Sequence, residues 1–289
     1  MFIPYKVDVE ITRPPFANYA ILLGMLIIFA FFQTTFLLRL QDNPFLALTS
    51  NWLPYLLDGW TLRGLLGHMW LHAGIWHVLG NMIFLGVFGN AVCSKVGNAA
   101  YPFVYVALGV AAGMTHLVFN DAAAIGASGA INGIVGMFLV FYPLNEVSCL
   151  LILFFRFITF SVSSMWIILL WLVFDILGAI WGGGGVAYAA HLGGFAAGVA
   201  LGVVFLKTGL VRPGRGDRTL LDFLGLGPGA IGKGGSLARG SKPPTATRAD
   251  QRTIQFRCRC GRLTSVPAEY AGRRARCPAC ERMLTIPPR

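Results

Sequence analysis

Long apolar runs separated by short polar segments dominate the first two hundred residues of the chain. Runs of about 16 to 23 residues match the length that a helix needs to cross the hydrocarbon core of a bilayer. We therefore expect an all-α polytopic membrane protein, with a six-transmembrane-helix bundle in residues 1–206. The predicted spans are about 16–38, 75–93, 100–119, 128–143, 163–181 and 185–206.

Two stretches between these runs differ from spans. Residues 39–74 have mixed polarity and contain several tryptophans, and aromatic residues favour the headgroup zone of a bilayer. Residues 144–162 are rich in Phe and Ile but are interrupted by Arg156. We expect a structured interfacial loop for the first stretch. The second either extends the fifth span or lies in the interface, and we favour the interface.

Glycines recur at helical spacing in the fourth and sixth predicted spans. Small residues on one face let neighbouring helices approach closely inside a membrane. The pattern predicts that the fourth span is a central helix enclosed by protein and that the sixth packs tightly against a neighbour. The residues are Gly129, Gly133 and Gly136 in the fourth span, and Gly194, Gly198 and Gly202 in the sixth.

Composition supports the membrane interpretation. The 289-residue chain is 56% hydrophobic, with a mean hydropathy of +0.67. Only 12% of its residues are charged, against about 25% in soluble domains. The first apolar run is also too long for the core of a signal peptide, so we expect it to remain as a span. These features exclude an ordinary soluble globular protein.

Positive charge is concentrated at the C-terminal end. From Lys207 onward the chain has 17 Lys or Arg and 5 Asp or Glu, against 6 and 7 in residues 1–206. The basic residues directly after the last span, together with Lys95 between the second and third, predict that this side is cytoplasmic. We expect an integral protein of a bacterial cytoplasmic membrane with both termini cytoplasmic. Residues 207–252 read as a Gly/Pro/basic flexible linker, in which 219–226 is a candidate short helix.

Ionisable and nucleophilic groups at membrane depth are costly, so each is a functional candidate. Ser128, in the stretch GASGAING, falls at the start of an apolar helix, where unpaired N–H groups and the helix dipole favour negative charge. An N-cap role is the alternative for this serine. His191, near the start of the sixth span, is a candidate base for it. Asp175, sixteen positions before His191, is a candidate to orient that base.

Histidines also cluster before and within the second span. The pairs His68/His72 and His77/Asn81 are each four residues apart, so each pair can share a helix face. Histidines at this spacing can bind zinc. However, the chain has no HExxH and no acidic residue between Asp58 and Asp121. We therefore disfavour a metal site in the membrane, and with it a metal transporter.

Three motifs in order carry a family resemblance: H77-VLG-N81, G126-A-S128-G and AH191LGG. Over about residues 16–206 the chain resembles the rhomboid intramembrane serine proteases. The resemblance implies six spans and a Ser–His dyad that needs no cofactor for catalysis. Ser128 would be the nucleophile and His191 the base, and His77 and Asn81, with the Ser128 backbone N–H, would form the oxyanion hole.

The resemblance also implies the substrate and sets a limit on the match. Rhomboid substrates are single membrane-spanning helices cut near one end, and Gly126, Ala127 and Gly129 would contact them. Many relatives place an aromatic residue where this chain has Asn132, so polar neighbours would hold His191 here. A proteolytically silent rhomboid-like adaptor or chaperone that binds transmembrane clients is the alternative. Such proteins usually lack the serine or the histidine, and this chain has both.

The C-terminal residues 253–289 have a different composition. Cys258 and Cys260 form one close pair, and Cys277 and Cys280 form another. Two close cysteine pairs at this separation match a four-cysteine zinc site, and the segment resembles a small β zinc ribbon with a structural zinc ion. Two disulfides are the alternative, which a cytoplasmic position disfavours. We expect the basic tail to contact anionic lipid or a cytoplasmic protein rather than nucleic acid.

Overall fold

The computed structural model describes residues 2–42, 53–153, 156–182, 185–214 and 217–227, and in the C-terminal part 253–257, 263–267, 272, 274–276 and 283–286. The chain divides into two compact units, Met1–Gly234 and Gly235–Arg289. The first unit holds the apolar helices and the second holds short strands.

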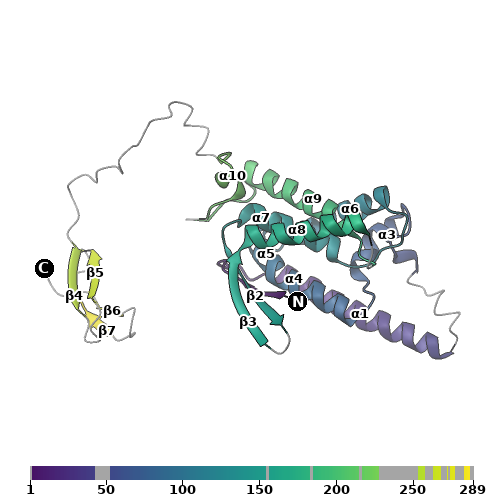
Figure 1. Ribbon diagram of the computed structural model, residues 1–289, viewed down its shortest axis with the longest axis horizontal. Helices are drawn as coiled ribbons and strands as arrows, with labels where there is room; N and C mark the ends of the chain where they lie inside the picture. Colours follow the sequence, from purple (N-terminus) through teal and green to yellow (C-terminus); the bar gives the residue numbers. More distant parts are fainter. Residues whose placement is uncertain are drawn as a thin grey trace. The chain divides into compact units, whose positions relative to one another are not determined.

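Each of the six predicted spans contains a helix (Figure 1). In the described part of the chain, four continuous helical stretches are long and apolar enough to cross a membrane, while Phe16–Phe32 and Ser128–Phe141 are shorter apolar helices. The first unit is therefore a mostly helical polytopic membrane bundle, and the count of six spans stays a prediction. The helices are α1 (Phe16–Asp42), α4 (Ile75–Phe84), α6 (Tyr101–Phe119), α7 (Ser128–Phe141), α8 (Ser164–Trp181) and α9 (Tyr188–Lys207), and α4 continues through a π-helical turn, η3 (Leu85–Gly89), into α5 (Asn90–Val96).

Helix α7 lies at the centre of the bundle, with every residue from Gly133 to Phe141 buried. It packs against α9 through glycines, because a Cβ atom on Gly198 would overlap the carbonyl oxygen of Gly133. A Cβ atom on Gly194 would likewise overlap the carbonyl oxygen of Gly129. The predicted central position of this helix and its close packing are confirmed.

A three-stranded antiparallel sheet corrects the all-α expectation. Its strands are β1 (Phe2–Val7), β2 (Glu146–Leu153) and β3 (Arg156–Ser163), in the order β1-β2-β3. Residues 144–162 thus form most of a hairpin and do not extend the fifth span. An apolar run of this length cannot be assigned to strand or helix from periodicity alone. Its β-branched residues, among them Val147, Ile158 and Thr159, favour the strand conformation.

From residue 53 onward, where the structure describes it, the loop before α4 is structured, as expected, and contains short helical turns. These are η1 (Leu53–Tyr55), α3 (Leu62–Gly67) and η2 (His68–Trp70). The side chain of Thr61 caps α3 by accepting a hydrogen bond from the Gly64 N–H at 3.0 Å. An isolated bridge between Leu57 and Ala124 joins this loop to the segment that precedes α7.

The segment after α9 is packed, although the sequence suggested a linker from residue 207. Its short helix α10 (Leu220–Phe223) lies inside the stretch 219–226 and begins with a capping box between Thr219 and Asp222. Val211 and Leu221 are buried side chains of this segment. Two apolar anchors and a well-capped turn explain why the membrane unit extends past the expected boundary.

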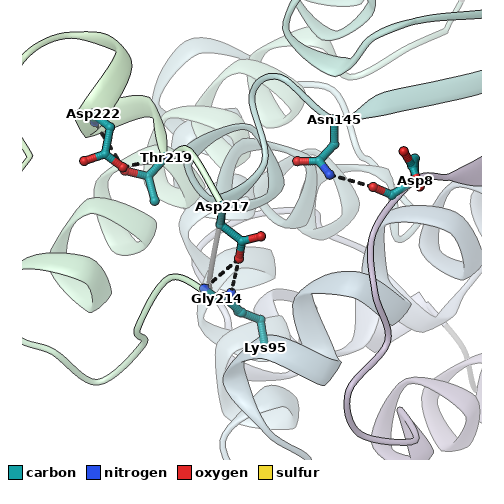
Figure 2. A network of polar contacts seen from close by, with 7 residues as sticks. All are labelled: Asp8, Lys95, Asn145, Gly214, Asp217, Thr219 and Asp222. Atoms are coloured by element: carbon teal, nitrogen blue, oxygen red, sulfur yellow. Dashed lines mark hydrogen bonds and ion pairs between the residues drawn. The ribbon is translucent and has the colours of Figure 1, made fainter. Parts of the chain in front are cut away.

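An ion pair fixes the same segment to the bundle, as Figure 2 shows. Lys95 Nζ lies 2.7 Å from Asp217 Oδ2, which also accepts the Gly214 N–H at 2.8 Å. Nearby, the Asn145 side chain donates to the backbone carbonyl of Asp8. The end of α5, the start of the sheet and the segment after α9 therefore lie at the same end of the bundle. Ser128 lies at the opposite end of α7.

The described residues of the second unit form two small hairpins. Strand β4 (Thr253–Arg257) pairs with β5 (Leu263–Pro267), and β6 (Arg274–Arg276) pairs with β7 (Met283–Thr285), both antiparallel. In the sequence, each cysteine pair falls between the two strands of one hairpin. The four cysteines themselves, Cys258, Cys260, Cys277 and Cys280, lie outside the described residues, so the predicted zinc ribbon stays a prediction.

Candidate active site

Ser128 and His191 meet where two helices begin. Ser128 is the first residue of α7, and His191 lies in the first turn of α9. The hydroxyl oxygen of Ser128 is 2.8 Å from Nε2 of His191. Glycine packing between α7 and α9 makes this approach possible, because it brings the two backbones close together along the whole contact.

His77 and Asn81 face the same region from α4. The Nδ1 atom of His77 accepts a long hydrogen bond, 3.4 Å, from the Ala73 N–H, so its Nε2 atom is the one that carries the proton. That Nε2 atom faces Gly126, where an added Cβ would lie 2.7 Å away. Gly126 also has a φ of +123°. Only glycine meets both requirements.

Asn81 has a buried side-chain hydrogen-bond donor that no described residue pairs with. Its side chain is buried, and its Nδ2 atom has no partner among the described residues. An unpaired buried amide costs free energy of about 1–3 kcal/mol. Such a group is expected where a ligand or reacting atom completes the hydrogen bond.

These groups line one cavity of about 360 Å³. Its polar wall is formed by His77, Asn81, Ser128, Asn132, Asp175 and His191, and the rest is apolar and aromatic, including Phe84, Trp171 and Phe174. The cavity therefore combines a nucleophile, a base and an amide donor with apolar walls. This combination suits hydrolysis of an apolar peptide segment.

Asp175 on α8 lies beside the imidazole of His191. Its Oδ1 atom is 3.1 Å from Nδ1 of His191. The ring of Tyr188 lies edge-on to the same imidazole, with the centroids 6.3 Å apart. The Asn132 side chain instead donates to the Ser128 carbonyl oxygen at 3.0 Å. His191 is thus held mainly by a polar neighbour, in agreement with the expectation drawn from Asn132.

The remaining candidates are placed as follows. Ala127 and Gly129 are buried beside Ser128, outside the cavity lining. His68 lies in η2 and bonds the Gly64 carbonyl, so His68 and His72 do not share a helix face. His72 packs edge-on against His77, with the ring centroids 5.1 Å apart. Burial lowers the pKa of His72 to about 4, and the neighbouring His77 adds to this effect, so its ring is neutral.

Within the residues that the structure describes, no three His, Cys, Asp or Glu side chains are grouped to hold a metal ion. Asp175, which the sequence offered as a candidate to orient His191, is the one carboxylate within the fifth predicted span. A lone intramembrane carboxylate is itself a functional signal, and it was the available clue.

Comparison with known proteins matches the part of the chain that holds the cavity. A Rhomboid domain matches residues 59–208, a range that includes every polar group of the cavity. RHOMBOID-like protein 1 of Arabidopsis thaliana is 34% identical over 153 residues, covering 50% of this chain and 34% of that protein. RHOMBOID-like protein 4 of the same plant is 30% identical over 160 residues, covering 54% of this chain and 35% of its own length. The chain thus spans about a third of these curated relatives.

Proposed function

Because the chain belongs to the rhomboid family of membrane proteins, we propose that it is an intramembrane serine endopeptidase. Its substrates are membrane proteins that present a transmembrane helix. The observation that carries the proposal is the 2.8 Å contact between the Ser128 hydroxyl and His191 Nε2 inside an apolar-walled cavity. A serine within reach of a neutral imidazole is the arrangement that activates a hydroxyl for acyl transfer.

In the proposed reaction His191 takes the Ser128 proton while Oγ attacks the scissile carbonyl carbon. The carbonyl oxygen becomes an oxyanion, and the imidazolium then gives its proton to the leaving amine. Water, activated by the same imidazole, hydrolyses the acyl-enzyme and regenerates Ser128. The two residues act as a unit, so loss of either one removes most of the chemical rate.

The oxyanion donors are supplied by α4 and by the start of α7. Asn81 Nδ2 offers the unpaired N–H described above, and His77 offers Nε2–H. The Ser128 backbone N–H is in the first turn of α7, where N–H groups lack intrahelical partners. Donors fixed in place before the reaction stabilise developing charge strongly because they need no reorganisation.

The orientation in the membrane forms part of the proposal. Lys95 and the basic segment after α9 lie at one end of the bundle, and an excess of Lys and Arg marks the cytoplasmic side. We place both termini there, with the catalytic cavity near the opposite surface. The protease requires no cofactor, and the proposed zinc in residues 253–289 is structural.

The test is cleavage of a fluorescently labelled single-span protein by the purified full-length chain in detergent. Wild type should release the expected fragment, whereas Ser128→Ala and His191→Ala should not. A fluorophosphonate should label wild type and leave Ser128→Ala unlabelled. Turnover by purified Ser128→Ala would refute the serine mechanism. Substrate binding without cleavage or labelling in wild type would favour the silent adaptor instead.

A further inference from the structure

The polar contacts around His191 continue beyond the dyad. Ser128 Oγ is 2.8 Å from His191 Nε2, and His191 Nδ1 is 3.1 Å from Asp175 Oδ1. The three groups come from α7, α9 and α8. We propose that Asp175 is a positioning residue that turns the dyad of this protein into a Ser–His–Asp relay. This inference rests on the proposed protease function.

The chemistry of the imidazole explains the role. His191 can accept the serine proton at Nε2 only if its proton resides on Nδ1. A carboxylate that accepts the Nδ1–H selects this tautomer and holds the ring in one orientation. It also stabilises the imidazolium that forms when the serine attacks. Asp175 receives no proton in this scheme, so the proton moves only between Ser128, His191 and the leaving amine.

The surroundings of His191 leave this role to Asp175. The other titratable or nucleophilic groups facing the ring are His77 from α4, Ser128 from α7 and Tyr188 from α9. None of them is a carboxylate. Both partners are mostly shielded, since the His191 and Asp175 side chains are 14% and 19% exposed. A charge–dipole interaction is stronger there than in bulk water.

The experiment compares Asp175→Asn with wild type in the full chain, and Asp121→Asn serves as a control because its carboxylate is exposed. Asp175→Asn should lower kcat by about 10²-fold or more and leave KM unchanged. Its fluorophosphonate labelling of Ser128 should slow in parallel. Asp175→Glu should restore part of the rate.

The outcomes separate the two proposals. If wild type is neither active nor labelled, the protease proposal fails. If wild type is labelled and Asp175→Asn matches it in kcat and in labelling rate, the protease proposal stands and the role of Asp175 is refuted. Loss of the folded state in Asp175→Asn would likewise count against a positioning role, because the carboxylate would then serve stability.

A second inference comes from the sheet at the other end of the bundle. Phe157 and Ile158 are 72% and 43% exposed and point to opposite faces of β3, because side chains alternate along a strand. Nearer the helices, the outward face carries Ser148 and Ser161. The hairpin is therefore apolar on both faces only at its tip. We call residues Leu153, Arg156, Phe157 and Ile158 the hairpin tip.

We infer that the hairpin tip inserts into the headgroup–acyl boundary of the adjacent bilayer leaflet. Strand β3 runs directly into α8, from Ser163 to Ser164, so the hairpin starts where a membrane-crossing helix starts. Figure 1 shows β2 and β3 running across the direction of α8. Aromatic rings favour this boundary, and Arg156 can reach lipid phosphate from it. The free edge of β3 excludes deeper insertion because its unpaired backbone groups need water.

Photocrosslinking tests this placement in the full-length protein within membranes. A benzophenone amino acid replaces Phe157 in one variant and Ser161 in a control, and the adducts are identified by mass spectrometry. The Phe157 probe should give mainly lipid adducts, several-fold more than the Ser161 probe. Equal lipid yields at the two positions would refute the inference. Crosslinks from Phe157 to a second copy or to another protein would also refute it.

Discussion

Replacing Asn81 by leucine should slow the proposed reaction without destabilising the protein. Asn81 is buried and lines the catalytic cavity, and its Nδ2 atom has no partner among the described residues. Leucine has a similar size and no polar atoms. The substitution therefore removes the proposed oxyanion donor and at the same time removes a buried group that the free protein leaves unsatisfied.

The two effects have opposite signs. Loss of one oxyanion donor typically lowers kcat by about 10²–10³-fold, or about 2.7–4 kcal/mol in the transition state. Relief of the unpaired amide should raise the free energy of unfolding by about 1–3 kcal/mol. If Asn81 instead stabilised the fold, its replacement would lower the free energy of unfolding, and activity would fall only as the folded fraction fell.

The assay measures kcat and KM on a labelled single-span substrate and the thermal unfolding midpoint in the same detergent. We expect a large fall in kcat with KM nearly constant, while the unfolding midpoint is unchanged or higher. Fluorophosphonate should still label Ser128 in Asn81→Leu, although slowly. Wild-type kcat in this variant would remove Asn81 from the mechanism. A lowered unfolding midpoint would contradict the inference that the Asn81 amide is unpaired in the free protein.

Three further predictions concern structure. Gly198→Ala should cost about 1–3 kcal/mol of stability because its Cβ would overlap the Gly133 carbonyl. Gly86→Ala should be tolerated because, outside its own helix backbone, no atom of the described residues lies within 4 Å of the added Cβ. Equal thermal unfolding midpoints of the two variants would contradict this. Burial raises the pKa of Asp217, but hydrogen bonds from Lys95 and Gly214 lower it below 3.8 overall. Asp217→Asn should therefore cost about 0.2–1 kcal/mol at pH 7, and the difference should fade as pH drops through the lowered pKa; a pH-independent difference would exclude the ion pair. Elemental analysis should find one zinc per full-length chain and none in a protein ending at Gly227, while both cleave substrate; zinc in the shorter protein would point to the membrane histidines.

Local patterns in the sequence predicted the helices, whereas the pairing of Ser128 with His191 was an expectation that also relied on the family resemblance. Ser128 follows Gly126 and Ala127 and starts an apolar run, and His191 lies near the start of another run that carries a glycine repeat. Helix starts are strong local signals, and a small-residue repeat predicts which helices approach closely. Together they bring the starts of α7 and α9 to one place.

Features that depend on long-range packing were harder to predict. In the run 144–162 the interruption by Arg156 does not decide between strand and helix, because periodicity alone cannot assign a short apolar run. Strand β1, which pairs with this run, lies more than a hundred residues earlier. The Lys95–Asp217 pair likewise joins residues 122 positions apart. Which side of α8 faces His191 depends on how that helix rotates within the bundle, and apart from Asp175 its nearly uniform apolar sequence does not encode a preferred face.

The peripheral position of α8 makes the contact between Asp175 and His191 sensitive to how this helix packs. Only 17% of its apolar stretch of 18 residues is buried inside the protein, compared with 39% for α6, so α8 is the more peripheral of the two helices. Ser128 and His191, in contrast, are carried by two helices that glycines hold in close contact. A shift of α8 by a few ångströms would break the 3.1 Å contact between Asp175 and His191 and leave the serine–histidine contact intact. If Asp175 positions the base, the rate of the dyad depends on how closely α8 packs against it, and substitutions in the α8 contact should change kcat without touching either dyad residue.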